Sequence, residues 1–456
     1  MAVTRFINAT VPGEGRGEIS MKRGSMSGPP GNKPGYAVVV LLLLAVASTA
    51  AHAALEERRD AQLLQLLEEA ARNNPEIRAA RNELEAARQR VSPAGALDDP
   101  MLEAGIVNAP LASQTFRRED MTMKMLGLSQ RLPFPGKRGL RQDVAAKDAE
   151  SVAHAYQETV NRVARDVKTA YFELALIVES TRLVEENRRV LGQFLRISES
   201  RYAVGQATQA DVLKAQTQQT GMVDELIKLA RERRTIEAEL ALALGRQSDA
   251  GLPVLATLPL PETALQFESL RETALTERPQ LLGLKSLIDR SEKALELARK
   301  DYYPDFDVKL AYGQRENMLD GTRRDDMLSL TVAINLPVWR ENKRDPGVAE
   351  AIAMRNQARD MYQAQLNEVS SQLRQQVASA EQSLKSARLY ETGILPQARL
   401  AVESSLAAYR VNRVDFLTLL DSQMTVLNYE ISYASVLSNY NMALAEIEFL
   451  TGKTLF

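Results

Sequence analysis

The chain has 456 residues, of which 45% are hydrophobic, 25% are charged and 5% are aromatic, and its formal net charge is −2. A nearly neutral chain has no field that would recruit nucleic acid or an anionic membrane surface, so nucleic-acid binding is set aside. Because the sequence contains no cysteine, disulfides, thiolate metal sites and an acylated lipid anchor are not expected. Few aromatic residues beside abundant Ala, Leu, Gln, Glu and Arg favour long helices.

The first elements in chain order are an N-terminal extension and a signal peptide, expected over residues 1–53. Lys33 precedes the apolar run Ala37–Ala47, and Ala51 and Ala53 supply the small residues of a cleavage site. The run is too short to span a bilayer well, which predicts export by cleavage rather than a retained membrane helix. The starting residue stays open among Met1, Met21 and Met26.

The most informative feature of the remaining chain is an internal duplication. Three pairs of prolines share an offset of 204 residues: Pro75 with Pro279, Pro100 with Pro304, and Pro133 with Pro337. Farther along the offset is 207, which places three extra residues in the second copy before Tyr409. The pairs at this offset are Tyr202 with Tyr409, Gln216 with Gln423 and Gly245 with Gly452. We therefore predict a first repeat at 54–246, a linker at 247–263 and a second repeat at 264–456.

Each repeat begins with a predicted helix and then changes period. Helical composition covers Leu55–Arg90, with Pro75 at a break or first turn, and also Pro279–Lys300. In the second copy, Phe306–Tyr312 and Leu328–Leu336 alternate between apolar and polar residues, which predicts a β-hairpin within 304–337. Its apolar face would carry Phe306, Val308, Leu310 and Tyr312, opposite Asp307 and Lys309. In the first copy the hairpin is expected within 100–132, with strands at Met101–Val107 and Met121–Gln130, although the face of Met121, Met123 and Met125 is ambiguous.

Long helices follow each hairpin. From Tyr156 to Val184, apolar or small residues recur at alternating spacings of three and four, which is the pattern of a coiled-coil seam. A continuous helix over Arg138–Tyr202 would be roughly 100 Å long at about 1.5 Å per residue, too long for a compact globule. A second helix returns from Thr208 to Leu244, which completes helices over 138–246. The second copy repeats this plan over 346–452, with helices at Pro346–Tyr409 and Phe416–Thr451.

Four strands are too few to close a barrel, and a bilayer leaves no edge strand unpaired. Two copies of the chain would supply eight strands and three copies twelve. The strands of about ten residues match an outer membrane, whereas the many charged residues of the helices require water. The fold class is therefore mainly α with a small β part, in which long coiled-coil hairpins extend from a barrel shared between copies.

Across residues 55–456 the sequence resembles the TolC family of outer-membrane efflux proteins. The residues that carry the resemblance are Leu128–Arg138, Arg201–Leu213 and Tyr409–Asp421, and the run Phe134–Arg138 is closest to the CzcC/CusC heavy-metal branch. The resemblance implies a homotrimer with a 12-stranded β-barrel in the outer-membrane lipid of a Gram-negative bacterium and a periplasmic α-barrel. It also implies a periplasmic adaptor and an inner-membrane pump, of the RND or ABC type, as partners. The chain itself would be a passive duct for heavy-metal cations or drugs, and not an enzyme.

The resemblance further implies that the tips of the two helical hairpins hold the functional residues. The periplasmic gate would fall on Asp421, Asp211 and Thr418, with one acidic ring fewer than in the archetype because Thr418 replaces an acid. The adaptor-docking residues would be Tyr202, Gly205, Thr208, Tyr409, Asn412 and Asp415. Gly205 is expected to need a positive φ, a conformation that Asn412 tolerates in the other copy. The plain alternative is that Asp211 and Asp421 are ordinary carboxylates on a helix surface.

Other functions find little support in the sequence. His52 is expected to leave with the signal peptide, and His154 has no second histidine or cysteine with which to bind a metal. The methionines at 121, 123 and 125 are explained by packing or lipid contact, and Pro135–Gly139 lacks the spacing of a phosphate-binding loop. We expect no catalytic, metal or cofactor site. Type I protein secretion stays an alternative, as do a periplasmic adaptor and a structural coiled coil, and the sequence does not identify the cargo.

Overall fold

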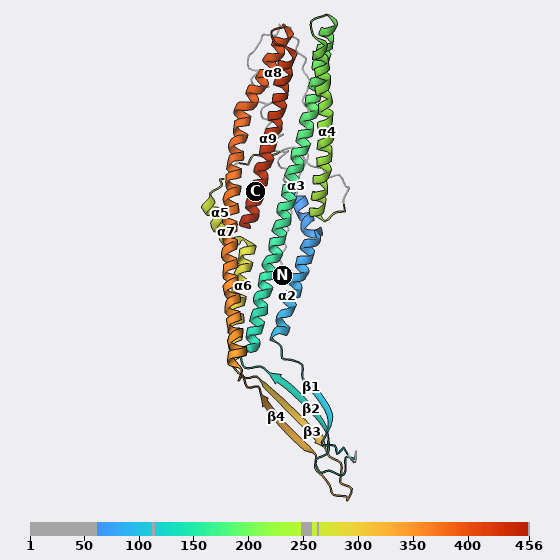
Figure 1. Cartoon of the computed structure of the whole chain (residues 1–456), viewed down its shortest axis with the longest axis vertical. Helices are drawn as coiled ribbons and strands as arrows, with labels where there is room; N and C mark the ends of the chain where they lie inside the picture. The colour runs from blue at the N-terminus through green and yellow to red at the C-terminus, as the bar shows by residue number, and fades with distance from the viewer. Residues whose placement is uncertain (1–61, 112–114, 248–257, 262–263, 455–456) are drawn as a thin grey trace, which may run out of the picture. The chain divides into compact units, whose positions relative to one another are not determined.

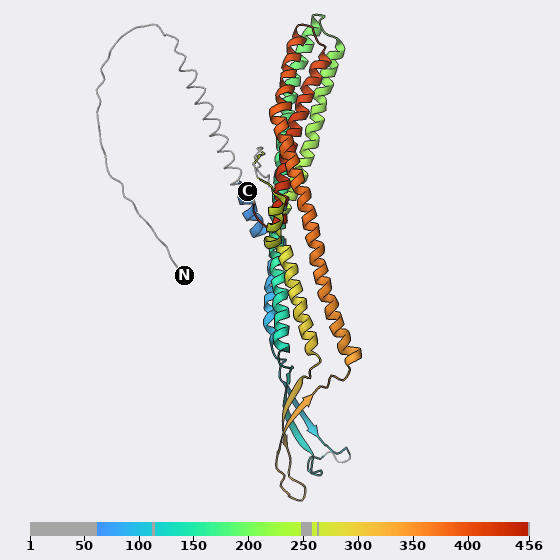
Figure 2. The same cartoon turned by 90° about the vertical axis from the view of Figure 1, so that its left-hand side faces the viewer.

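The structure is a computed structural model that describes residues 62–111, 115–247, 258–261 and 264–454. All of these belong to one compact unit, Leu55–Phe456. The expected signal peptide lies outside the described residues, as does much of the predicted linker at 247–263. Figure 1 and Figure 2 show the helices and strands of this unit from two directions.

The helices of the first copy follow the prediction closely. Residues 62–73 are helical, and α2 covers Pro75–Gly95. Asn74 caps α2, because its side-chain oxygen accepts the backbone N–H groups of Glu76 and Ile77 at 2.8 and 3.2 Å. Pro75 thus occupies the first turn, where a missing N–H costs nothing. The two long helices are α3 (Lys137–Ala203, 67 residues) and α4 (Gln209–Leu244).

The second copy is more irregular than the first. The single helix predicted over 346–409 is instead divided by a π-turn, and the short helix α5 was not predicted. The elements are α5 (Phe267–Glu277), α6 (Pro279–Lys300), the π-turn η1 (Arg340–Arg344), α7 (Asp345–Leu389), the π-turn η2 (Tyr390–Ile394), α8 (Leu395–Arg410) and α9 (Phe416–Thr451).

The two π-turns explain part of the change in repeat offset. Both η1 and η2 lie between Pro337 and Tyr409, the interval in which the offset grows from 204 to 207. A π-turn closes its hydrogen bond one residue later than an α-turn, so each one absorbs one extra residue inside a helix. Two of the three extra residues are thereby taken up without a loop.

The strands of the described residues form one antiparallel sheet in the order β1-β2-β3-β4. Their bounds are β1 (Met101–Val107), β2 (Met123–Leu132), β3 (Phe306–Gln314) and β4 (Met327–Ile334). The strand predicted to begin at Met121 begins at Met123 instead, because the Thr122 hydroxyl donates to the Asn108 carbonyl at 2.8 Å and holds a turn there. Strands β2 and β3 join the two copies, with Leu132 opposite Phe306.

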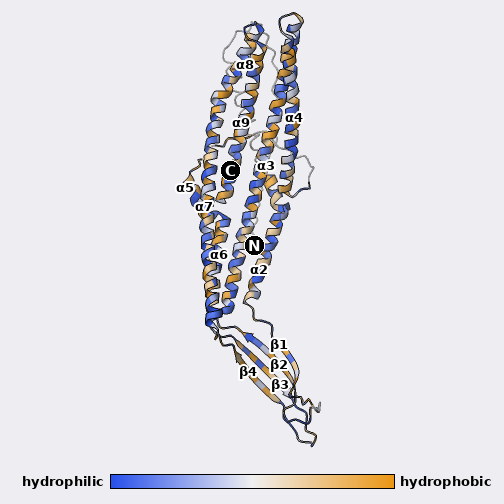
Figure 3. Ribbon diagram, viewed as in Figure 1, coloured by the Kyte–Doolittle hydropathy of each residue, from blue (hydrophilic) through white to orange (hydrophobic). Residues whose placement is uncertain are grey.

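Hydrophobic and hydrophilic residues are interspersed along the strands (Figure 3), and the strand register gives the sheet one strongly apolar face and one face of small, polar and methionine residues. The apolar face is exposed in the single chain, as the exposed fractions of Leu102 (71%), Leu330 (71%) and Leu128 (50%) show. The opposite face carries Lys309, whose ammonium pairs with Glu103 across the sheet. The ambiguous methionines are resolved, since Met125 lies opposite Gly313 and therefore on the face away from Leu126 and Leu128. An exposed apolar face of this extent predicts a further partner.

The helical part holds the hydrophobic core. Helix α3 contacts α2, α4, α6 and α9, so it connects the two copies along its length. The seam predicted for α3 is buried: Val163, Val167 and Leu174 are at most 3% exposed. Among the described residues, none of the helices combines the length and the apolarity that crossing a membrane requires.

Candidate gate and docking tips

The two hairpin tips have the same backbone conformation. Gly205 follows α3 with φ +71°, and Asn412 follows α8 with φ +58°. These residues are 207 positions apart, the offset of the duplication, so the predicted positive φ is confirmed at Gly205 and the asparagine takes it in the second copy. Glycine and asparagine are the residues that enter this region at least cost.

Both return helices begin with a side-chain cap at equivalent positions. The Thr208 hydroxyl accepts the Asp211 N–H at 3.2 Å, and the Asp211 carboxylate accepts the Thr208 N–H at 2.9 Å, which completes a capping box. In the second copy the Asp415 carboxylate accepts both the backbone N–H (2.9 Å) and the hydroxyl of Thr418. These bonds from the Thr418 side chain and backbone lower the pKa of Asp415.

Asp421 differs from the other candidate gate residues because its carboxylate takes no part in a helix cap. It is exposed, and within the part of the chain that the structure describes it makes no hydrogen bond or ion pair. Asp211 and Thr418 are each engaged in a helix cap, and no such bond joins Asp211 to Asp421. Of the two acids among the predicted gate residues, Asp421 is thus the one whose carboxylate takes no part in a helix cap.

The two tip tyrosines have different surroundings. Tyr202 is 49% exposed, whereas Tyr409 is 5% exposed. The Tyr409 ring packs edge-on against Phe416, with ring centroids 5.7 Å apart. The guanidinium of Arg201 lies 4.5 Å from the centre of the Tyr409 ring and donates to the Tyr409 carbonyl at 2.5 Å. Arg201 therefore joins the first tip to the second.

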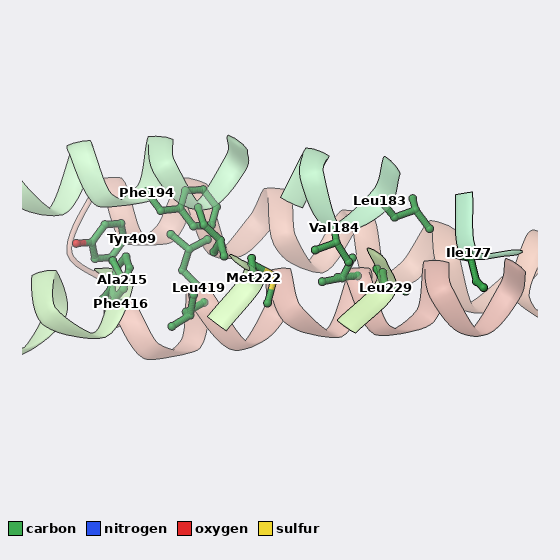
Figure 4. Close-up of a cluster of buried hydrophobic side chains, with 13 residues drawn as sticks. Ile177, Leu183, Val184, Phe194, Ala215, Met222, Leu229, Tyr409, Phe416 and Leu419 are labelled. Atoms are coloured by element: carbon green, nitrogen blue, oxygen red, sulfur yellow. The ribbon is translucent and has the colours of Figure 1, made fainter. Parts of the chain in front are cut away.

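A buried hydrophobic cluster lies beneath the tips and connects both copies (Figure 4). Phe194 and Val184 on α3 pack there with Phe416 and Leu419 on α9. One polar layer interrupts it: Asn187 is 2% exposed, and its side-chain oxygen accepts the Gln423 amide at 2.8 Å. A satisfied polar pair inside a helical seam fixes how the helices pair along their length.

Sequence reasoning missed Arg201 and Asn187 as contributors to this site. Arg201 lies within the motif that carried the family resemblance, but its equivalent at the 207 offset is Ala408, so the duplication gave no signal for it. Asn187 falls on the continued coiled-coil seam, where a polar residue in an apolar row is a usable sign of a buried pair. Its partner Gln423 was visible in the sequence only as the repeat equivalent of Gln216.

Within the described ranges, no group of three or more His, Asp or Glu side chains is placed to hold a metal ion. His154 lies on α3 against α6, where its Cβ faces Gly283. The chain thus combines a four-stranded sheet whose apolar face is exposed with two helical tips that are capped by side chains.

Comparisons with known proteins agree with this description. The family described as outer membrane efflux protein matches residues 66–246 and 270–453, one segment for each repeat. The cobalt-zinc-cadmium resistance protein CzcC of Cupriavidus metallidurans is 23% identical over 397 residues, which cover 84% of this chain and 88% of CzcC. The outer membrane protein TolC of Vibrio cholerae is 23% identical over 369 residues, covering 79% and 83%. The solved structure of CusC superimposes with a TM-score of 0.73 at 14% identity, covering 86% of this chain and 92% of CusC.

The chain therefore belongs to the outer membrane efflux protein family, as its sequence resemblance predicted. The TolC-like fold class is also confirmed. The family is one of outer-membrane channels in Gram-negative bacteria, which excludes the alternatives of a periplasmic adaptor and a purely structural coiled coil.

Proposed function

We propose that the chain is the outer-membrane duct of a tripartite efflux system and that it acts as a homotrimer, without catalysis of its own. The observation that carries the proposal is the sheet. Its outer strands β1 and β4 each have one unpaired edge within the described residues, and its apolar face is exposed. In lipid, unpaired backbone groups cost several kcal/mol each. Closure by two further copies removes every edge.

The duplication specifies how copies would pair. Strand β2, the last of the first hairpin, pairs with β3, the first of the second hairpin. The equivalent of β2 is β4 and the equivalent of β3 is β1, so β4 of one copy should pair with β1 of the next in the same register. Applied at the offset of 204, the observed pair Ser129 and Lys309 predicts Ala333 opposite Gly105 of the neighbouring copy. Six equivalent hairpins from three copies then close twelve strands.

The long helices would form the periplasmic conduit, and Asp421 its charged ring near the entrance. Three symmetry-related carboxylates in a narrow opening attract cations and oppose anions by Coulomb interaction. Asp211 and Thr418 would lie in the same region but act through helix capping. An Asp421→Asn variant should lower the cation selectivity of single channels in planar bilayers. The matched variant Asp224→Asn, at an exposed carboxylate on α4, should leave it unchanged. Equal selectivity in wild type and Asp421→Asn removes Asp421 from the gate.

The tips would also receive a periplasmic adaptor. Val204 and Val411 occupy equivalent positions in the two turns and are 68% and 63% exposed, and Leu417 on α9 is 56% exposed. Apolar side chains held in water on capped tips indicate a docking surface. The exposed ring of Tyr202 adds to this surface, whereas Gly205, Thr208, Asn412 and Asp415 set the shape of the turns and Tyr409 supports them from below.

Heavy-metal cations are the proposed cargo, because CzcC is a cobalt-zinc-cadmium resistance protein and covers most of this chain. The pump would then be of the RND type. Deletion of the gene should sensitise cells to divalent metals, and complementation should restore tolerance. Tolerance to a panel of organic drugs should be measured in the same strains, because sensitivity to drugs and not to metals would indicate the other class of cargo. The purified protein should fractionate with outer membranes and have the mass of three chains in detergent. A lone soluble subunit contradicts the proposal.

A further inference from the structure

The segment that connects β4 to α7 exposes apolar and cationic side chains next to one another. Leu336, Val338 and Trp339 are 72%, 67% and 70% exposed. They follow β4 directly, at the sheet edge that is continuous with the exposed apolar face. The π-turn η1 comes next and holds Arg340, Lys343 and Arg344 within five residues.

The same end of the sheet holds other aromatic residues. Phe134 after β2 stacks on Tyr303 before β3, with ring centroids 4.6 Å apart and planes at 19°. The ammonium of Lys300 lies 5.6 Å from the centre of each ring. Strand pairing places these segments at one level, because Leu132 is opposite Phe306 and Phe306 is opposite Ile334. Aromatic rings with basic partners at one level are typical of a membrane–water interface.

The cations of η1 are unpaired, unlike others nearby. The ammonium of Lys137 lies 2.9 Å from Asp305 and 3.2 Å from Asp301. In contrast, no carboxylate of the described chain lies within ion-pairing distance of Arg340, Lys343 or Arg344, and none of the three makes a side-chain hydrogen bond. Glu341 is the one acid inside the turn, so η1 has a local charge excess of two although the chain is nearly neutral.

The exposed tryptophan and the unpaired cations are specific to the second copy. The equivalent segment of the first copy has Pro135 in place of Trp339, and it also carries two cations, Lys137 and Arg138. Lys137 pairs with Asp301 and Asp305, and Arg138 donates to the Gly95 carbonyl at 2.9 Å, so these cations are engaged within the fold, whereas those of η1 are not. Unpaired cations beside an exposed tryptophan at this level match the phosphate of a lipid whose chains contact the apolar face.

We propose that Trp339, Arg340, Lys343 and Arg344 bind the headgroup of an anionic phospholipid in the periplasmic leaflet, one per chain. This inference rests on the proposed membrane position of the sheet. The cations hold the phosphate, and Trp339 lies at the interface against the upper acyl chain. Anionic lipid is thereby concentrated at the β4 edge of each subunit, where it would border the joint between copies.

The chain's single tryptophan makes the test direct, because all intrinsic tryptophan fluorescence comes from Trp339. The full-length protein is placed in phosphatidylcholine vesicles with a minor fraction of phosphatidylglycerol. Bromine, which quenches tryptophan on contact, is carried near the headgroup end of the chains of either one lipid or the other, at the same mole fraction. Brominated phosphatidylglycerol should quench Trp339 at least about twofold more strongly than brominated phosphatidylcholine, given the attraction of each cation for anionic lipid.

The variant R340Q/K343Q/R344Q should lose this preference while both lipids still quench. The matched variant R231Q/R233Q/R234Q, at exposed arginines on α4, should keep it. Added inorganic phosphate should not displace the preference, because the lipid and not a free anion is bound. Equal quenching by both lipids in the wild type, or a preference that survives in R340Q/K343Q/R344Q, overturns the inference and leaves the membrane position intact. No quenching by either lipid would instead contradict the proposed function itself.

Discussion

The two helical tips share a backbone plan but differ in what their side chains do. In both, a positive φ ends the turn and a side-chain cap starts the next helix, at Gly205 and Thr208 in one copy and at Asn412 and Asp415 in the other. The first tip keeps its tyrosine exposed, whereas the second buries Tyr409 against its neighbours.

This difference shows which features a duplication keeps. Turn geometry and caps depend on one or two residues and are retained at a fixed offset. Packing depends on partners from the other copy, and those partners are not duplicated: Phe416 has Gln209 as its equivalent, and Arg201 has Ala408. The tyrosine of the second tip supports the contact between the tips, whereas the tyrosine of the first tip stays exposed. The following predictions test this division, from the largest effect to the smallest.

Removal of the Phe416 ring should destabilise the helical part most. Phe416 is 2% exposed and contacts Tyr409, so Phe416→Ala leaves a cavity and should cost about 3–5 kcal/mol in the free energy of unfolding. Its equivalent Gln209 is exposed, and Gln209→Ala should change this free energy by less than about 0.5 kcal/mol. Chemical unfolding of the detergent-solubilised protein, followed by circular dichroism, measures both. Similar losses in the two variants would show that the tips are equivalent after all.

Loss of the bridge between the tips should have the next largest effect. Arg201→Met keeps the aliphatic stem but removes the guanidinium from the Tyr409 ring and carbonyl, and should cost about 1–2 kcal/mol. Arg196→Met, five residues earlier on α3 at an exposed position, is the matched control. Hydrogen exchange should show faster opening of residues 409–416 in Arg201→Met alone. Unchanged protection there rules out a bridge.

The positive-φ positions should respond in opposite ways to a change of side chain. Gly205→Ala places a Cβ in the left-handed region, although the surrounding space is open, and should cost about 1–2 kcal/mol. Asn412→Gly removes a mild strain but loosens the unfolded chain, so its net effect should lie within a few tenths of a kcal/mol of zero. The two unfolding midpoints test this asymmetry. An alanine at position 205 that costs nothing would mean that the turn does not hold its φ of +71°.

The smallest expected effect is a pH dependence confined to the second tip. The folded-state pKa of Asp415 is lowered by the bonds from Thr418, so the stability that it contributes is present above its unfolded pKa of about 3.9. That contribution is lost as the pH falls through the folded pKa. The Thr418 amide should therefore exchange faster, relative to the Asp211 amide at the Thr208 cap, in acid below about pH 4. Asp415→Asn, which keeps a capping oxygen, should abolish the pH dependence of this ratio.

Features set by local periodicity could be predicted from the sequence. The strand Phe306–Tyr312 alternates strictly and lies within β3, α6 has the predicted bounds, and the long seam of α3 is buried. The positive φ at Gly205 also followed from local chemistry, because few other residues enter that region.

Features set by contacts between distant segments could not be predicted in the same way. The only sign of the π-turn η2 in the sequence is the changed repeat offset. The pairing of β2 with β3 joins segments that are far apart in the sequence, so no local pattern predicts it. The sequence could not distinguish Asp421, which takes part in no helix cap, from Asp211, which caps a helix, because both are single acids near a turn. Their difference depends on which backbone N–H lies within reach in the folded tip.

The central claim is that β4 of one copy pairs with β1 of the next, in the register that β2 and β3 already show. The chain lacks cysteine, so the pair Ala333→Cys and Gly105→Cys can be introduced cleanly. Within one chain these positions lie on opposite edges of the sheet, and strand pairing places Gly105 level with Met327, six residues before Ala333. Three strand spacings of roughly 4.8 Å and six residues at about 3.3 Å each separate the two positions by more than about 20 Å, beyond the reach of a disulfide. Oxidation in isolated membranes should give covalent dimers and trimers and nothing larger, whereas Ala333→Cys with Met101→Cys, four residues out of register, should give none. Monomers alone from the first pair, or a ladder beyond the trimer, would contradict the account.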